Sequence, residues 1–311
     1  MKYKKLGNSD LMVSVVGLGT WAMGNDFWGE VDDSASINTI QKAIDCGVNL
    51  IDTAPAYGKG HAEIIVGKAI KGKRDKVVIA TKCGIIPGGE KVRNLKPQSI
   101  RNELHESLKR LNTDYIDLYQ IHWPDEDTPI EETLEEMMKF QKEGKVKYIG
   151  VSNFDIELLS RSMEIAPITS IQPQFSLLSR ENEQIIEFCR MHGIGVLSYG
   201  SLGAGMLSGK FTGKPEFNKG DNRSRFYPFF NEPMLSKALR LVDELRKIAA
   251  KYDKPVSHIA INWVVQHEAI SSALVGAKTP KQAEENALAG YWELAAEDIS
   301  QIDRAYDEIF A

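Results

Sequence analysis

The sequence predicts a (β/α)8 barrel in which residues 1–311 form a single domain. Short apolar runs recur along the chain, each long enough for a strand and too short for a helix. Segments with helical periodicity lie between these runs, which indicates a parallel sheet covered by helices. Eight such runs are present, and this number favours a closed barrel over a doubly wound open sheet. Barrels of this class commonly occupy about 250 residues or more as one domain.

The elements can be placed in chain order. Residues 7–10, Gly-Asn-Ser-Asp, form a turn signal between alternating segments and predict a β-hairpin before the barrel. The predicted barrel strands are residues 13–18, 48–52, 77–82, 115–122, 148–152, 170–174, 195–199 and 273–276. The predicted helices between them are residues 34–46, 63–70, 100–111, 130–141, 156–165, 181–191 and 256–266.

Two helix starts carry a threonine followed by proline, at Thr128-Pro129 and Thr279-Pro280. Both are typical of a capping box with proline as the first helical residue. The barrel units leave over the stretch 203–232 and two additional helices, at residues 235–251 and 296–309. A stretch as long as 203–232 in a compact domain is usually a lid or a binding loop.

Composition excludes several classes of function. The formal net charge is -5, with acidic and basic residues mixed along the chain, so neither nucleic acid nor an anionic membrane surface is an expected partner. Cys46, Cys83 and Cys189 are too widely spaced for a metal motif or a disulfide framework, and we expect a reducing compartment and no metal. The polar N-terminus and the lack of a long apolar run predict a cytoplasmic protein.

Polar residues end three successive strand candidates, at Asp52, Lys82 and His122. Chemistry in such barrels gathers at the carboxyl ends of the strands, and the strand period of two allows all three side chains to point into the barrel mouth. Taken singly, each has an ordinary explanation, because a strand-end aspartate caps turns, most lysines are solvated and a lone histidine is often structural. Their occurrence on neighbouring strands is what favours a site.

A tyrosine follows the first of these residues closely. Asp52 and Lys82 in a partly buried rim would form an ion pair, and the cation would lower the pKa of a nearby phenol. Tyr57, five residues after Asp52, is the candidate for that phenol.

With these residues the chain resembles the aldo-keto reductases, in particular a bacterial branch of that family. The resemblance runs from Gly17 to Asn286 and depends on several motifs in combination. They are Gly17-Leu18-Gly19-Thr20-Trp21, Asp52-Thr53-Ala54 with Tyr57-Gly58, Thr81-Lys82, Ile121-His122, Gly150-Val151-Ser152-Asn153-Phe154, Gln172-Pro173-Gln174-Phe175 and Val275-Gly276-Ala277-Lys278.

The resemblance implies an NAD(P)H-dependent reduction of aldehydes or ketones. Tyr57 would protonate the carbonyl oxygen as hydride arrives from the cofactor, with its pKa set by Lys82, which Asp52 holds in place. His122 would orient the carbonyl and stabilise the developing oxyanion.

The resemblance also implies a cofactor site along the rim. Ser152, Asn153 and Gln172 would hold the carboxamide and Tyr199 would stack on the ring, although a helix cap and a core aromatic explain such residues equally well. The implied cofactor contacts also include Gly19, Thr20, Trp21, Asp52, Gly200, Ser201, Leu202, Gly203, Lys210, Arg225, Gly276, Ala277, Lys278, Thr279, Gln282, Glu285 and Asn286. No G-x-G-x-x-G is present, so a Rossmann site is not expected.

NADP(H) is the cofactor that the resemblance favours, with NAD(H) as the alternative. Many relatives carry an arginine for the 2′-phosphate where this chain has Gln282, which could instead complete the capping box of Thr279. Lys278, Lys281 or Arg225 could take over the phosphate contact.

Substrate and assembly are less constrained. Trp21, Phe27, Trp28 and Trp123 could wall an apolar pocket for a small carbonyl substrate, and a monomer is expected. Two alternatives remain open at this point. One is a cofactor-bound redox sensor or regulatory subunit with little turnover, and the other is an aldolase that forms a Schiff base on Lys82.

Overall fold

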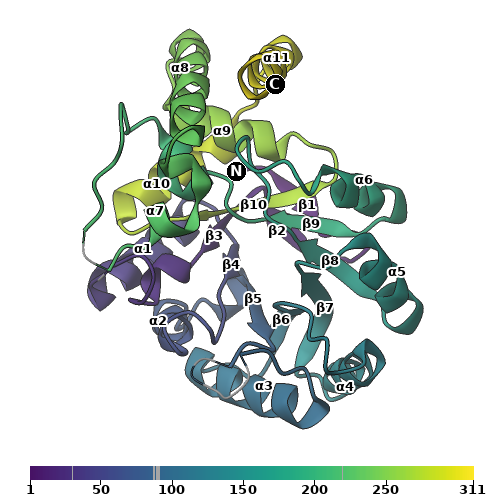
Figure 1. Cartoon of the computed structure of the whole chain (residues 1–311). Helices are drawn as coiled ribbons and strands as arrows, with labels where there is room; N and C mark the ends of the chain where they lie inside the picture. Colours follow the sequence, from purple (N-terminus) through teal and green to yellow (C-terminus); the bar gives the residue numbers. More distant parts are fainter. Residues whose placement is uncertain (30, 87, 89–91, 219) are drawn as a thin grey trace.

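The computed structural model describes residues 1–29, 31–86, 88, 92–218 and 220–311, and in these residues eight parallel strands close into a barrel (Figure 1). The strands are β3 (Val16–Gly19), β4 (Leu50–Asp52), β5 (Val78–Cys83), β6 (Ile116–Ile121), β7 (Val146–Ser152), β8 (Ile168–Gln172), β9 (Gly195–Ser198) and β10 (Ile270–Gly276). The last strand pairs with the first, with Gly276 opposite Gly19, and so closes the ring. The predicted barrel is confirmed; residue 219 of the predicted stretch 203–232 lies outside the described residues.

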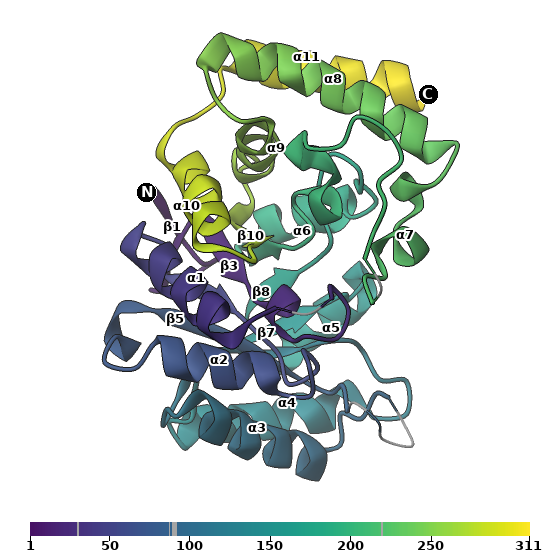
Figure 2. The ribbon, with the colours of Figure 1, turned by 90° about the vertical axis from the view of Figure 1, so that its left-hand side faces the viewer.

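Helices follow the strands and cover the outside of the barrel (Figure 1). They are α1 (Asp33–Asp45), α2 (His61–Ala69), α3 (Pro97–Leu111), α4 (Ile130–Lys142), α5 (Ile156–Ile165), α6 (Glu183–His192), α9 (Val256–Val265) and α10 (Pro280–Leu288). The predicted additional helices are α8 (Met234–Tyr252) and α11 (Ala296–Phe310), which lie side by side on one flank of the barrel (Figure 2). Short helical turns occur in the loops at η1 (Trp21–Met23), η2 (Arg74–Lys76), η3 (Gly203–Ser208), α7 (Arg223–Phe226), η4 (Pro228–Phe230) and η5 (Ala289–Tyr291).

The N-terminal hairpin consists of β1 (Tyr3–Lys5) and β2 (Met12–Ser14), as predicted. Leu6 and Val13 are fully buried with the side chains that fill the barrel, so the hairpin closes one end of it. The predicted strand 13–18 is wrong in its start, because residues 12–14 belong to the hairpin and the barrel strand begins at Val16. Residues 13–18 are buried in both strands, so their apolar character does not show where β2 ends and β3 begins.

The two predicted helix caps have different outcomes. Thr279 caps α10 by accepting a hydrogen bond from the Gln282 backbone N–H at 3.2 Å, as expected. Thr128 does not cap α4, because α4 begins at Ile130 and the Thr128 hydroxyl instead donates to the Asp125 carboxylate at 2.7 Å. A nearby acceptor thus draws the hydroxyl away from the helix terminus.

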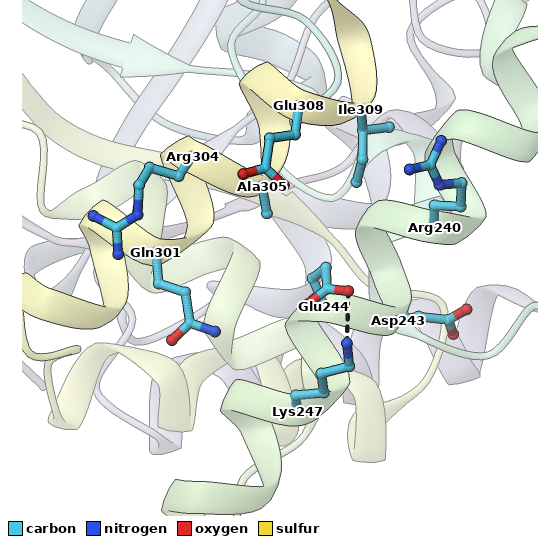
Figure 3. A pocket seen from close by; sticks show the side chains of 9 residues that line it. All are labelled: Arg240, Asp243, Glu244, Lys247, Gln301, Arg304, Ala305, Glu308 and Ile309. Carbon is cyan, nitrogen blue, oxygen red and sulfur yellow. Dashed lines mark hydrogen bonds and ion pairs between the residues drawn. The ribbon is translucent and has the colours of Figure 1, made fainter.

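A hollow of about 530 Å³ lies between α8 and α11 on the flank of the barrel (Figure 3). Charged side chains of both signs line it, among them Arg240, Asp243 and Arg304. Glu244 and Lys247 within it pair with each other at 2.7 Å. The hollow is therefore formed by outer helices, whereas the residues singled out from the sequence lie at the strand ends.

In the described part of the chain, no helix has the length and apolar character needed to cross a membrane. Within the same residues, no group of three or more histidine, cysteine, aspartate or glutamate side chains is arranged to hold a metal ion. The three cysteines are free thiols.

Candidate active site

The barrel brings three predicted residues together at the carboxyl ends of neighbouring strands. Asp52 ends β4, Lys82 lies near the end of β5, and His122 follows β6. The register pairs Asp52 with Ala80 on β5, and the Asp52 and Lys82 side chains converge from these adjacent strands. Asp52 is 3% exposed and Lys82 is fully buried. The predicted inward orientation of the three side chains agrees with this arrangement.

Lys82 is the centre of the cluster. Its ammonium donates to both carboxylate oxygens of Asp52, at 2.8 and 2.7 Å, and to the backbone oxygen of Thr53 at 3.0 Å. It also lies 3.1 Å from the hydroxyl of Tyr57. An ammonium has three protons to donate, and these oxygens engage all of them.

Tyr57 reaches the cluster from the loop between β4 and α2. Its ring meets the His122 ring nearly edge-on, with centroids 5.9 Å apart, and stacks with Trp21 at 6.0 Å. The loop is fixed beside it, because the Gly58 backbone N–H donates to the Asp26 carboxylate at 2.9 Å. The phenol is thus enclosed between a cation, an imidazole and an aromatic wall.

Burial controls the protonation of these groups. It raises the pKa of Tyr57 well above its usual value, and the carboxylates of Asp52 and Asp26 act in the same direction. The expected lowering of this pKa by Lys82 is therefore not met, and the phenol is protonated at neutral pH. Burial lowers the pKa of Lys82, which Asp52 opposes, and burial together with Lys82 lowers the pKa of His122 well below its usual value. The His122 imidazole is consequently neutral.

Ser152 and Asn153, two of the residues predicted to hold the carboxamide, form a hydrogen-bonded chain with Tyr199, which was predicted to stack on the nicotinamide ring. The Tyr199 hydroxyl donates to the Asn153 side-chain oxygen at 3.0 Å. The Asn153 amide donates in turn to the backbone oxygen of His122 at 3.0 Å and to the Ser152 hydroxyl at 2.9 Å. Asn153 adopts the left-handed conformation, with φ of 60°, which asparagine tolerates better than most residues. The chain links the ends of β6, β7 and β9.

Two glutamine side chains continue this network inside the barrel. The Gln172 amide donates to Asp52 at 2.8 Å, and the Gln120 amide lies 3.5 Å from the same oxygen. Gln120 is fully buried on β6, and sequence reasoning missed it. A polar residue that shares the inward register of β6 with Ile116 and Leu118 was the available signal.

The end of β3 adds backbone support and aromatic surface. The Thr20 backbone N–H and hydroxyl both donate to the backbone oxygen of Asp52, at 3.0 and 2.9 Å. Trp21, next to Thr20 after Gly19, stacks on Phe27 at 4.6 Å and meets Trp28 edge-on at 5.4 Å. These three predicted aromatic residues therefore form one cluster.

Phe226 adjoins this cluster, whereas the contact that the structure gives Trp123 is with an arginine. Phe226 on α7 meets Phe27 edge-on at 5.4 Å, although sequence reasoning had not selected it. Trp123 was predicted to belong to the same wall, and its ring packs under the Arg93 guanidinium at 5.0 Å.

Three cations gather beside the turn that follows β9. The turn contains Gly200, Ser201, Leu202 and Gly203, and Gly200, Gly203 and Gly205 all have positive φ values. A β-carbon placed on Gly205 would lie 3.4 Å from the Arg223 guanidinium and 3.6 Å from the Lys210 ammonium. Burial lowers the pKa of Lys210, and the nearby Arg223 and Lys278 lower it further. Mutual repulsion of this kind makes the region favourable for an anion.

Arg223 is the cation that sequence reasoning missed in this region. It donates to the Asp221 carboxylate through two nitrogens, at 2.6 and 2.9 Å, and to the backbone oxygen of Ala204 at 3.0 Å. Arg225, predicted as a phosphate partner, is exposed on the same helical turn. Residues two positions apart on a helix point about 200° apart, so the two arginine side chains leave α7 in nearly opposite directions.

The long loop meets the segment that follows η1. Asp221 pairs with Trp28 in an isolated antiparallel bridge, and the Asn222 backbone N–H donates to the backbone oxygen of Phe27 at 3.1 Å. The Lys278 ammonium donates to the backbone oxygen of Trp28. Parts of the chain that follow β3, β9 and β10 are thereby joined.

The residues predicted for the adenosine end lie at the end of β10 and on α10. The Gln282 side chain accepts from the Lys278 backbone N–H at 2.8 Å, so it joins the cap formed by Thr279. Asn286 donates to the backbone oxygen of Gly276 at 3.2 Å, next to the buried Ala277. The Glu285 carboxylate accepts from the Ser257 hydroxyl at 3.0 Å.

Comparison with known proteins gives a consistent result. The model of the Aldo/keto reductase family matches residues 15–307. The chain is 43% identical over 308 residues to the aldo-keto reductase YhdN of Bacillus subtilis (strain 168), with 97% of this chain and 93% of that protein covered. It is 37% identical over 307 residues to the NADH-specific methylglyoxal reductase of Escherichia coli (strain K12), with 93% of each covered. The structure of the glycerol dehydrogenase AKR11B4 from Gluconobacter oxydans superposes with a TM-score of 0.89 at 39% identity, with 98% of this chain and 95% of that chain covered.

Proposed function

Because this chain belongs to the aldo/keto reductase family, we propose that it reduces small aldehydes or ketones to alcohols with hydride from a nicotinamide cofactor. One observation carries the assignment of residues. The Tyr57 hydroxyl lies 3.1 Å from the Lys82 ammonium, which is itself held in a buried pair with Asp52 at the barrel rim. In this proposal Tyr57 is the general acid.

Tyr57 is suited to give up a proton only when charge develops on the substrate. Its raised pKa keeps the phenol protonated until that point. When a nicotinamide is bound it supplies the hydride, which goes to the carbonyl carbon while the Tyr57 proton goes to the oxygen. The phenolate that is left lies beside the Lys82 ammonium, which stabilises it. A proton from solvent then restores the phenol.

His122 orients the carbonyl group. Its depressed pKa keeps the imidazole neutral, so it offers one N–H as a hydrogen-bond donor and does not compete with Tyr57 as an acid. Its ring lies edge-on to the Tyr57 ring with centroids 5.9 Å apart, so the two side chains are neighbours at the rim. Two donors aimed at one oxygen stabilise a developing negative charge.

The described residues fit a nicotinamide dinucleotide. The chain from Tyr199 through Asn153 to Ser152 presents amide and hydroxyl groups for a carboxamide. Gly205 in this turn has no side chain and adjoins the Lys210 and Arg223 cations, as a pyrophosphate requires. We infer that NADP(H) is preferred because these cations and Lys278 favour an additional phosphate. NAD(H) remains the alternative, because Gln282 is engaged in the helix cap.

The Schiff-base alternative is not supported. All three protons of the Lys82 ammonium have oxygen partners, among them the Asp52 carboxylate. A lysine held in this way stays protonated and is a weak nucleophile. The sensor alternative likewise gains no observation of its own. The single-domain organisation, monomeric state and cytoplasmic location that the sequence predicts belong to the proposal.

Replacement of Tyr57 by phenylalanine tests the assignment. We expect kcat to fall by about 10²- to 10⁴-fold while the affinity for NADPH is retained, because only the proton donor is lost. Stopped-flow oxidation of bound NADPH by a carbonyl compound such as methylglyoxal measures the step directly. Tyr119→Phe is the matched control, since this buried tyrosine on β6 donates to the Ile100 backbone oxygen at 3.3 Å and lies outside the cluster. An unchanged rate in Tyr57→Phe contradicts the proposal.

A further inference from the structure

A buried carboxylate lies directly behind the barrel rim and takes no part in the mechanism described above. Glu63, in the first turn of α2, is fully buried. One of its oxygens accepts from the Thr81 hydroxyl on β5 at 2.6 Å, and the other accepts from the Arg110 guanidinium on α3 at 2.6 Å. This single carboxylate therefore ties together α2, α3 and β5.

Both ends of this link are next to the proposed reactive groups. Thr81 immediately precedes Lys82 on β5, with the two side chains on opposite faces of the strand. At the other end, the Ala62 and His61 backbone N–H groups donate to the backbone oxygens of Tyr57 and Gly58, at 3.3 and 3.1 Å. The first turn of α2 is thus bound to the loop that carries the phenol.

Tyr57 and Lys82 lie on different elements, and the 3.1 Å contact between them depends on how these elements are held. We propose that Glu63 is a positioning residue that fixes the Tyr57 hydroxyl against the Lys82 ammonium, acting through its hydrogen bond to Thr81. This inference rests on the proposed function, because it assumes that the phenol and the ammonium act together.

A charged residue at this place has a specific physical consequence. An apolar side chain of similar size could fill the space between α2 and β5, but it could not bond to the Thr81 hydroxyl and would leave the Arg110 guanidinium without this carboxylate. Because the Glu63 carboxylate bonds to a hydroxyl on β5 and to a guanidinium on α3, it holds α2 in one position relative to β5. Glu103 on α3 also faces this region, where its carboxylate accepts from the Gly84 backbone N–H after β5 at 3.1 Å.

Two sets of variants test the proposal. Glu63→Gln removes the charge but keeps an acceptor, and Thr81→Val removes only the hydroxyl on β5, whereas Thr81→Ser retains that hydroxyl. We expect Glu63→Gln and Thr81→Val to lower kcat about tenfold, because small displacements of reacting groups have effects of this order or larger. The KM for methylglyoxal and the Kd for NADPH should change less than twofold, and Thr81→Ser should restore kcat to within about twofold of the unmodified protein.

Asp117→Asn is the matched control for lost stability. Asp117 is a buried carboxylate on β6 that likewise bonds to β5 and to an arginine, accepting from the Ile79 backbone N–H at 3.0 Å and pairing with Arg74 at 2.8 Å. It adjoins the start of β5 at Ile79, and two residues of that strand separate this contact from Lys82. Asp117→Asn should therefore lower the unfolding temperature and leave kcat unchanged when the protein is folded.

The outcomes are distinguishable. Loss of kcat in Glu63→Gln and Thr81→Val, with recovery in Thr81→Ser, supports the positioning role. The positioning role is overturned if kcat is unchanged in Thr81→Val, or if kcat falls equally in Thr81→Val and Asp117→Asn. The hydrogen bond between Glu63 and Thr81 would then serve stability alone. Tyr57→Phe is measured in parallel. If that variant keeps full activity, the proposed function itself has failed, whatever the Glu63 variants show.

Discussion

Replacing Lys82 by methionine removes the cation from a buried ion pair and leaves the Asp52 carboxylate behind. Breaking such a pair from one side typically destabilises a protein by about 3–5 kcal/mol, because the remaining charge is buried without its partner. Asp52 keeps the Gln172 amide at 2.8 Å, so we expect the lower part of this range. An unfolding entropy of about 2.1 cal/mol/K per residue turns about 3–4 kcal/mol into a decrease of roughly 5–6 °C in Tm for a chain of this length.

Urea unfolding followed by tryptophan fluorescence measures the free energy of unfolding, and the chain has five tryptophans to report it. A second variant, Lys82→Met combined with Asp52→Asn, removes both charges. It should recover most of the lost stability, since replacing both partners of a buried pair is often nearly neutral. Activity should remain absent in both variants because the phenolate has lost its cation.

The reasoning is refuted if Lys82→Met unfolds within about 1 kcal/mol of the unmodified protein, which is less than the usual effect of removing one partner from a buried pair. Asp52 would then carry no buried charge. It is also refuted if the double variant is less stable than the single one, because the loss would then come from packing and not from electrostatics.

Three further predictions follow from the fold and the site. Burial raises the pKa of Glu103 to about 8, so the folded protein holds a proton that the unfolded chain, with the ordinary value of 4.5, releases. The free energy of unfolding of the unmodified protein, compared with that of Glu103→Gln, should therefore fall as pH rises from about 4.5 to 8. Urea unfolding measures both values, and a difference between the two proteins that does not change with pH would contradict this. Gly58→Ala places a β-carbon 1.9 Å from the Gly24 backbone oxygen and should abolish most activity and lower Tm. In the control variant Gly72→Ala the β-carbon meets no atom within 4 Å, so the free energy of unfolding should fall by only about 1 kcal/mol. Gln282→Arg should raise NADPH affinity about tenfold and leave NADH affinity unchanged in fluorescence titrations, as expected for one added charged hydrogen bond.

The strand ends could be predicted because the information is local. A run of apolar residues with a period of two shows both that Asp52 ends a strand and that Lys82 points inward. Glu63 was missed for the opposite reason. Its partners lie 18 and 47 residues away, so nothing next to it shows that its charge is satisfied. A carboxylate on the apolar face of α2 was the only local signal.

The contacts of loop residues were harder to predict from the sequence than the ends of strands. The choice between Arg223 and Arg225 depends on which face of a single helical turn meets residues from elsewhere, such as Ala204. The cap expected at Thr128 failed because the Asp125 carboxylate competes for the hydroxyl. Thr128 is suited to a cap but bonds to a carboxylate three residues away, whereas Arg223 is held by a contact with Ala204, 19 residues away in the chain.

The opposite orientations of Thr81 and Lys82 on β5 have a consequence for refolding experiments. A slip of β5 by one residue against its neighbours would turn the threonine into the barrel and the lysine out of it. A chain collapsed in that register would be compact, helical and inactive. Only molecules with β5 correctly aligned therefore contribute to the recovered enzyme activity. Misaligned molecules contribute to the circular dichroism signal as well. The ratio of the two signals measures the fidelity of strand alignment during folding.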